Sequence, residues 1–191
     1  MRVVAGRLRG RTIEAPPGRT LRPTADRVRE SIFNILVHGG LGAGGGSPLI
    51  GARVLDVFAG TGAMGIVALS RGAAHATFIE RDAQALAALR ANLRALGEAA
   101  NATVLGADAL LPPRAVEKVS IAFLDPPYRE GLGPQALTAL ARAGWFAKDA
   151  IATVEVAARE GFAAPEGFEI LDERRYGAAR VVIVRAKAAA L

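Results

Sequence analysis

The sequence predicts an α/β protein built on a mostly parallel, seven-stranded sheet that ends in an antiparallel hairpin. Between residues 53 and 156, short apolar runs alternate with helical patterns, which is typical of parallel strands joined by right-handed crossovers. The last two apolar runs, at residues 168–176 and 180–185, are separated by only three residues, too few for a helix. They therefore predict a hairpin at one edge of the sheet.

The elements begin with a basic N-terminal arm and a helix. Residues 25–37 predict the helix, because Thr24 is a suitable N-cap and apolar residues recur on one face. Residues 38–51 are rich in glycine, which predicts a flexible connection. We therefore expect an arm with its helix (1–37), a linker (38–51) and one larger domain (52–191).

The larger domain is expected to hold five strands and three helices before the hairpin, with the fourth strand beside the first. Its strands are predicted at residues 54–57, 77–80, 103–105, 119–124 and 152–156. Its helices are predicted from the glycine-rich turn after the first strand to about residue 71, and at residues 83–96 and 135–143.

Composition and charge favour one soluble domain with a nucleic-acid partner. The 191 residues are 51% hydrophobic and 22% charged, enough apolar material for a sizeable core. The net charge is +6, and the first 30 residues hold eight of the 24 basic residues but only three of the 18 acidic ones. Localised arginine suits phosphates and base edges. A solubilising terminus is the alternative reading of this arm.

Several classes of protein are excluded by what the sequence lacks. Cysteine is absent, which excludes disulfide scaffolds, cysteine-ligated metals and thiolate nucleophiles. His38 and His75 stand far apart, so we expect no metal site. No apolar run approaches the roughly 20 residues of a membrane span, and the N-terminus lacks the apolar stretch of a signal peptide. We therefore expect a cytoplasmic protein.

A glycine-rich turn follows the first predicted strand. Gly60, Gly62 and Gly65 have the G-x-G-x-x-G spacing, which lets the backbone turn sharply and approach a ligand. Such turns can serve packing alone, but Glu80 ends the next strand, where a carboxylate can accept both hydroxyls of a ribose. The turn predicts an adenosine-type cofactor. By itself it leaves nicotinamide dinucleotides and S-adenosylmethionine both open.

Two aspartates favour S-adenosylmethionine. Asp56 lies in the end of the first strand, where a buried carboxylate costs free energy unless it is paired. The ammonium of a methionine moiety would pair with it, whereas a pyrophosphate would be repelled. Asp108 follows the third strand, where it could accept a hydrogen bond from the adenine amine, although an ordinary turn aspartate is equally expected on local grounds.

The segment Asp125-Pro126-Pro127-Tyr128 stands at the carboxyl end of the fourth strand, where ligands bind in open α/β sheets. Its two prolines lack N–H groups and restrict the turn, so it presents carbonyl oxygens. Asp125 and the Pro126 carbonyl would accept the two N–H bonds of an amine while Tyr128 stacks on its ring. Holding both hydrogens aims the nitrogen lone pair at an electrophile, which is catalysis by positioning.

At these residues the sequence resembles class I S-adenosylmethionine-dependent methyltransferases, and in particular the RsmD family of bacterial 16S rRNA guanine-N2 methyltransferases. The resemblance implies a Rossmann-like fold, no metal, a monomer, and methylation of guanine 966 on small ribosomal subunits. The glycine-rich stretch at 38–51 looks longer than in the family. The resemblance covers nearly the whole chain and is carried by residues 5–11, 21–34, 55–65, 68–73, 80–82 and 125–128.

The resemblance implies a cofactor site residue by residue. Asp56 would hold the amino group of the methionine moiety, directly or through water. Glu80 would bind the ribose hydroxyls and Arg81 would lie beside the adenine. Asp108 would meet the adenine amine and Ala109 its ring. The methionine and ribose would be lined by Phe58, Ala59, Gly60, Thr61 and Gly62.

The resemblance also implies an RNA site. Asp125, Pro126 and Tyr128 would hold the target guanine, whose N2 attacks the sulfonium methyl in line without a covalent enzyme intermediate. Because guanine N2 lies within paired or stacked RNA, the base must be splayed out to reach this pocket. The expected contacts to the RNA backbone are Arg7, Arg9, Arg11 and Arg22.

Other functions explain parts of the sequence. An adenine-N6 methyltransferase acting on DNA or RNA would use an Asp-Pro-Pro-Tyr segment in the same way, to hold the adenine amine. However, no segment remains for a sizeable DNA target-recognition domain. A protein-glutamine methyltransferase would more often carry Asn in place of Asp125, and pyrimidine C5 methylation normally needs a cysteine. A nicotinamide-dependent oxidoreductase explains the glycines and Glu80 alone. A non-catalytic RNA-binding protein explains only the arm.

Overall fold

Seven strands and four helices make up the fold of the computed structural model, which describes residues 1–15, 23–40, 47–127 and 131–187. The strands are β1 (Arg53–Val57), β2 (His75–Glu80), β3 (Ala102–Gly106), β4 (Val119–Leu124), β5 (Phe146–Ala157), β6 (Phe168–Tyr176) and β7 (Ala179–Ala186). The helices are α1 (Pro23–His38), α2 (Ala63–Ser70), α3 (Ala83–Leu96) and α4 (Leu132–Arg142), with a short 3-10 helix at Ala99–Asn101.

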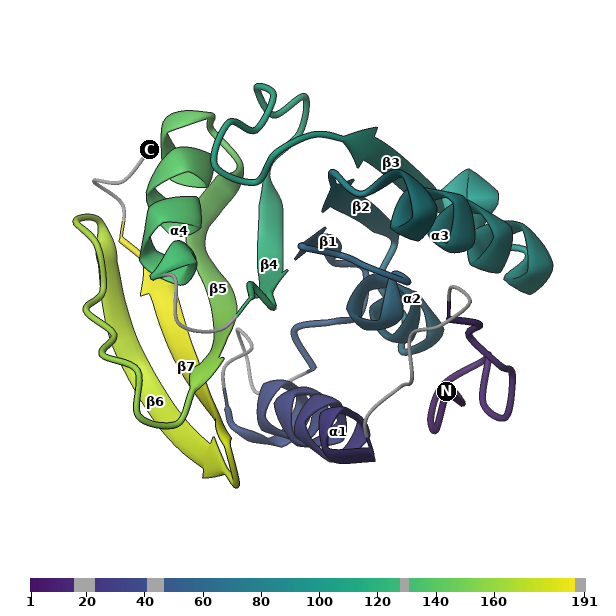
Figure 1. The fold of residues 1–191 in the computed structure, drawn as a ribbon, viewed down its shortest axis with the longest axis horizontal. Coiled ribbons are helices and arrows are strands. Elements are labelled where there is room, and N and C mark those ends of the chain that lie inside the picture. The colour runs from purple at the N-terminus through teal and green to yellow at the C-terminus, as the bar shows by residue number, and fades with distance from the viewer. Residues whose placement is uncertain (16–22, 41–46, 128–130, 188–191) are drawn as a thin grey trace.

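The strands form one sheet in the order β3-β2-β1-β4-β5-β7-β6 (Figure 1). The pairings among β1 to β5 are parallel, whereas β7 pairs antiparallel with both β5 and β6. This confirms the predicted mostly parallel sheet with its C-terminal hairpin and the place of the fourth strand beside the first. Among the described residues, no helix is both long and apolar enough to cross a membrane.

The predicted start of β5 was wrong by six residues, because the strand begins at Phe146 and not at residue 152. Phe146 pairs with Val119 of β4, and the register shifts before the pair of Ile121 and Ile151. The polar residues Lys148 and Asp149 interrupt the apolar run within this irregular stretch. Tertiary pairing therefore extends a strand that the local pattern does not show.

Two apolar layers cover the two faces of the sheet. Because successive strand residues point to opposite faces, Val54 lies in one buried cluster and Leu55 in the other. The Val54 cluster includes apolar residues of α1, α2 and α3, and the Leu55 cluster includes those of α4. Three helices therefore cover one face of the sheet, and α4 covers the other (Figure 1). The carboxyl ends of the parallel strands lie at the edge of the sheet between these two helical layers (Figure 1).

The first 13 residues of the basic arm are built into the molecule. Val3, Leu8 and Ile13 are buried in the same cluster as Val54. The Ser70 hydroxyl at the end of α2 accepts a hydrogen bond from the Leu8 N–H at 3.0 Å and donates one to the Ala5 carbonyl at 2.7 Å. The structure thus anchors the start of the arm, while the division of the chain at residues 37 and 52 stays a prediction.

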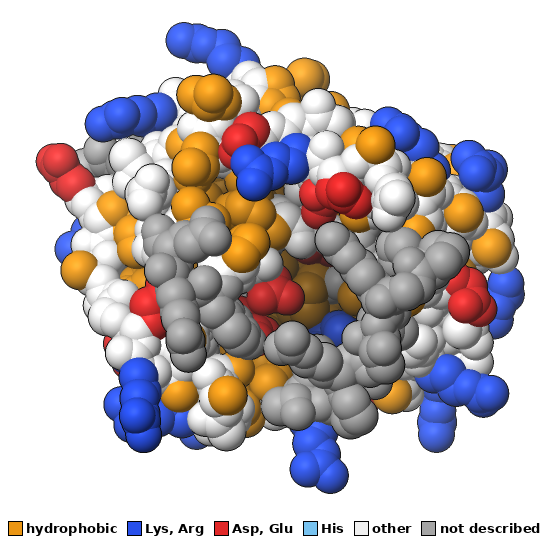
Figure 2. Space-filling view, in the orientation of Figure 1, with side chains coloured by type: hydrophobic (Ala, Val, Ile, Leu, Met, Phe, Trp, Pro, Cys, Tyr) orange, Lys and Arg blue, Asp and Glu red, His pale blue; other side chains and the backbone are white. Residues whose placement is uncertain are grey.

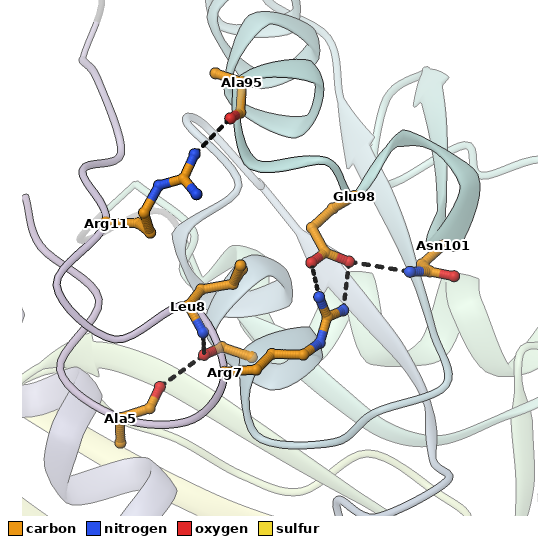
Figure 3. Close-up of polar contacts among 8 residues, drawn as sticks. Ala5, Arg7, Leu8, Arg11, Ala95, Glu98 and Asn101 are labelled. Atoms are coloured by element: carbon orange, nitrogen blue, oxygen red, sulfur yellow. Dashed lines mark hydrogen bonds and ion pairs between the residues drawn. The ribbon is translucent and has the colours of Figure 1, made fainter.

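Two arginines of the arm bind the end of α3 (Figure 3). Arg7 forms a two-pronged ion pair with Glu98, a carboxylate that is wholly buried and also accepts a hydrogen bond from the Asn101 amide. Arg11 donates a hydrogen bond of 2.7 Å to the carbonyl of Ala95. The buried charge of Glu98 thereby has its counter-charge in the arm.

We expect Arg7→Gln to lower the free energy of unfolding by about 2–3 kcal/mol, because it leaves the buried Glu98 carboxylate without its charged partner. Arg9→Gln is the matched control, since Arg9 is exposed and has no ion pair to any residue that the structure describes. Urea unfolding of both variants measures the difference. Equal midpoints for the two variants would show that the Glu98 ion pair does not hold the arm.

Candidate functional site

The site lies where β1 and β4 end side by side. Val57 and Leu124 are partners in the parallel register, and the N–H of Asp125 points to the Val57 carbonyl at 3.4 Å. The turn after β1 and the segment after β4 therefore leave the same edge of the sheet. Figure 2 shows carboxylates and apolar side chains exposed in a hollow in the middle of this view of the molecule.

The glycines of the turn have two different roles. A Cβ atom at Gly62 would collide with Leu89 of α3, and one at Gly65 would collide with the ring of Phe78 on β2. These two glycines allow the start of α2 to pack closely on α3 and β2. Gly60 has a φ of +55°, and a Cβ there would meet only the Phe58 carbonyl oxygen, at 4.0 Å, so its backbone is the part of the turn that a ligand can approach.

Asp56 is the buried carboxyl beneath this turn. It is 3% exposed and accepts a hydrogen bond of 2.9 Å from the Gly65 N–H. Burial raises the pKa of Asp56 to about 8 against the lowering effect of that hydrogen bond, and the carboxyls of Asp125 and Glu80 raise it further. The positive charge of the Arg29 guanidinium lowers the pKa of Asp56. Without a bound cation, Asp56 is thus largely protonated at neutral pH.

Asp125 is the second carboxyl with a strongly raised pKa. Its side chain keeps contact with solvent, but protein atoms desolvate it in part. This partial desolvation raises the pKa of Asp125 to about 7, with the Glu155 carboxylate adding to the rise and Arg29 opposing it. Pro126, the next predicted site residue, is buried, and Tyr128 lies outside the described residues.

Glu80 ties the end of β2 to the glycine turn. One of its oxygens accepts the Gly60 N–H at 2.8 Å, and the other accepts the N–H groups of Arg81 and Asp82, each at 2.8 Å. A carboxylate offers about four acceptor sites, so roughly one is left for a further donor. Binding of both ribose hydroxyls by Glu80 stays a prediction, and it requires one of these backbone contacts to give way.

Asp108 lies near Glu80, because the N–H of Ala107 donates to the Glu80 carbonyl at 3.0 Å. One Asp108 oxygen accepts the Leu110 N–H, and the other pairs with Arg81, both at 2.9 Å. The Leu110 hydrogen bond and the Arg81 guanidinium lower the pKa of Asp108. The structure brings Arg81 and Asp108 into an ion pair and buries Ala109, while their binding of an adenine stays a prediction.

Two charged residues of the site were not predicted from the sequence. Arg29 of α1 acts on both Asp56 and Asp125, and Glu155 of β5 acts on Asp125. Arg29 looks like a solvated residue of a basic helix, and Glu155 is a single charge in an apolar strand. The strand position of Glu155, with apolar neighbours on both sides, was the only available signal.

The predicted RNA contacts fall into three groups. The guanidinium groups of Arg7 and Arg11 are bound within the protein, by Glu98 and by the Ala95 carbonyl. Arg9 is exposed and Arg22 lies outside the described residues. Within the described part of the chain, no group of three or more histidine, aspartate or glutamate side chains could hold a metal ion.

Comparison with known proteins finds one family over nearly the whole chain. A family model described as "Conserved hypothetical protein 95" matches residues 1–185. Ribosomal RNA small subunit methyltransferase D from Escherichia coli is 39% identical over 163 residues, which cover 84% of this chain and 77% of that relative. A solved structure from Escherichia coli matches with a TM-score of 0.83 at 36% identity, covering 98% of both chains.

A more distant comparison concerns the fold alone. Magnesium protoporphyrin IX methyltransferase from Synechocystis is 15% identical and matches with a TM-score of 0.64, covering 89% of this chain and 87% of that one. Together with the Escherichia coli structure, it confirms the predicted Rossmann-like class I methyltransferase fold.

We expect Gly62→Ala to destabilise the protein by about 1–3 kcal/mol more than Gly97→Ala. Both glycines have a left-handed backbone, with φ of +81° and +74°, so both substitutions carry the same backbone strain. Only at Gly62 would the new Cβ meet Leu89, whereas the space at Gly97 is open. Thermal or urea unfolding compares them, and an equal loss of stability would rule out close packing at Gly62.

The ligand-free protein is expected to lose stability as the pH rises from about 4 to about 8. Unfolded Asp56 releases its proton near its usual pKa of about 3.9, whereas the native carboxyl keeps its proton to about 8. The native state therefore binds more protons in this window, and stability falls with pH. In Asp56→Asn this decline should be smaller, as urea unfolding at several pH values would show. Identical profiles would contradict a protonated Asp56.

Proposed function

This chain belongs to the family of ribosomal RNA small subunit methyltransferase D, and we propose that it transfers the methyl group of S-adenosylmethionine to the exocyclic N2 of a guanine in 16S rRNA. By family resemblance the target is guanine 966, on small ribosomal subunits or their assembly intermediates in the cytoplasm, and the enzyme acts as a monomer. The observation that carries the proposal is the position of Asp125 beside the glycine turn, at the shared edge of β1 and β4.

The residues around the turn fit S-adenosylmethionine. No described side chain crowds the position of a Cβ at Gly60, so a ligand can approach this part of the backbone. Glu80, which is bound to the Gly60 N–H, has about one acceptor site left for that ligand. Asp56 is a buried carboxyl without a cation of its own strong enough to keep its pKa low. An ammonium group is the complement that this carboxyl requires.

The proposed reaction rests on positioning by the segment after β4. S-adenosylmethionine supplies an electrophilic methyl group on a sulfonium sulfur. Asp125 and the Pro126 carbonyl accept the two N–H bonds of guanine N2, which directs the nitrogen lone pair at the methyl carbon. When the N–C bond forms and the C–S bond breaks, S-adenosylhomocysteine would leave with the bonding electron pair, and the methylated amine would become acidic. Asp125, with a pKa of about 7, is suited to take the proton that it sheds.

We expect Asp125→Ala to reduce methyl transfer at least about a hundredfold, because the amine loses both its hydrogen-bond acceptor and its proton acceptor. Affinity for S-adenosylmethionine, measured by calorimetry, should change little. Asp125→Asn is the matched control: it keeps the size and one acceptor oxygen but cannot take the proton, so an intermediate rate is expected. Loss of cofactor binding in Asp125→Ala would instead place Asp125 in the cofactor site.

Calorimetry also separates this proposal from a nicotinamide-dependent oxidoreductase. An ammonium beside Asp56 favours the ionised carboxylate, so binding of S-adenosylmethionine near pH 7 should release a proton, and the affinity should rise as the pH rises to about 8. Buffers of different ionisation enthalpy reveal that proton. Tight binding of NADH, with no binding of S-adenosylmethionine, would favour the oxidoreductase.

A further inference from the structure

A pocket rimmed by arginines lies where the N-terminal arm, α1 and α2 meet, and it has a volume of about 80 Å³. Arg2 comes from the arm, Arg27 and Arg29 from α1, and Arg71 from the residue after α2. Among the described residues that line the pocket, Glu30 is the single carboxylate. Four of the nine described lining residues are arginines, and arginine suits an anion that offers several acceptor oxygens.

Arg71 packs on an aromatic ring, and one of its N–H donors is unpaired within the described ranges. Its guanidinium lies over the ring of Phe33, 5.0 Å from the ring centre. Its Nε is buried and has no hydrogen-bond partner among the residues that the structure describes. A buried donor without an acceptor costs free energy. Burial also lowers the pKa of Arg71, although Glu30 opposes this. An anion bound in the pocket would stabilise this partly desolvated charge.

Arg29 connects the arginine pocket to the site at the end of β4. It lines the pocket, and its positive charge also lowers the pKa of Asp125 and of Asp56. Phe33 also lines the pocket, and its ring centre lies 5.4 Å from that of Phe123 on β4, two residues before Asp125, so the pocket lies close to the end of β4. A nucleotide whose base is held by Asp125 would carry its adjoining phosphates in this direction.

We propose that the arginine pocket binds the backbone phosphates that flank the target nucleotide in the RNA. The inference rests on the proposed function, because it takes the base held by Asp125 to be part of an RNA chain. Splaying a base out of RNA costs stacking and pairing energy, and contacts to the flanking backbone offset that cost. Backbone binding is thereby assigned to arginines other than Arg7 and Arg11, which are bound to the end of α3.

The test compares two double variants that remove the same charge. Arg2→Gln/Arg27→Gln changes two exposed arginines of the pocket. Arg114→Gln/Arg142→Gln changes two exposed arginines near the start of β4, where Ala115 bonds to the Ala143 carbonyl, at the opposite edge of the sheet. A short fluorescein-labelled single-stranded RNA is the binding probe, at a series of salt concentrations. Unmethylated small ribosomal subunits are the substrate for methyl transfer.

The pocket variant is expected to bind the RNA about tenfold more weakly and to show a similar rise in KM for subunits. Its salt slope should fall by about 0.7 for each phosphate that the protein no longer neutralises. The control variant should differ from the wild type by less than about twofold. Affinity for S-adenosylmethionine should be equal in all three proteins, which verifies that they are folded. Arg71→Lys keeps the charge but removes the forked guanidinium, and it should also weaken RNA binding.

Two results would overturn the inference in different ways. If the wild type methylates subunits and the pocket variant matches it in RNA affinity, salt slope and KM, the pocket does not bind the backbone, and the proposed function stands. If the wild type binds S-adenosylmethionine but methylates neither subunits nor free rRNA, the proposed function fails and the inference fails with it.

Discussion

The parallel pairing of β1 with β4 is the constraint on which the site depends. Both strands are buried, so their register is fixed by the apolar layers on the two faces of the sheet. That register makes Asp56 and Asp125 neighbours at one edge of the sheet, where desolvation raises the pKa of each and the charge of Asp125 raises the pKa of Asp56 further. Two carboxyls with raised pKa values at one edge of a sheet are suited to hold amino groups, one of a cofactor and one of a substrate.

The arginines of the basic arm have two different roles, which the sequence alone does not distinguish. Part of its charge is used inside the protein, where Arg7 neutralises the buried Glu98 and fixes the arm against α3. This anchoring brings Arg2 to the pocket that it lines together with Arg71. The arm is therefore both a structural element and part of a charged surface beside the site, and its arginines cannot be treated as equivalent.

Much of the fold could be predicted because local patterns and tertiary packing agree. The bounds of β4 and α3 match the prediction, and α3 begins after Asp82, whose side chain accepts the N–H of Ala85 as an N-cap. The start of β5 could not be predicted, because Lys148 and Asp149 break its apolar run and only pairing with β4 makes it a strand.

The site residues that stand at strand ends could be predicted from the sequence. Those that act on the site from distant parts of the chain could not. Asp56, Glu80 and Asp125 stand at strand ends, which the sequence shows directly. The effect of Arg29 on these carboxyls depends on how α1 packs across the sheet, and no local pattern contains that information. The pairing of Arg81 with Asp108 likewise depends on the neighbouring ends of β2 and β3.

Methylation of a guanine amine in 16S rRNA can be checked by identifying the nucleoside that receives the methyl group. Small ribosomal subunits from cells that lack this modification are incubated with the protein and S-adenosylmethionine labelled with tritium in the methyl group, and the rRNA is digested to nucleosides. We expect label in N2-methylguanosine at a single position of 16S rRNA. Label in N6-methyladenosine, or no label on subunits and free rRNA although the cofactor binds, would contradict it.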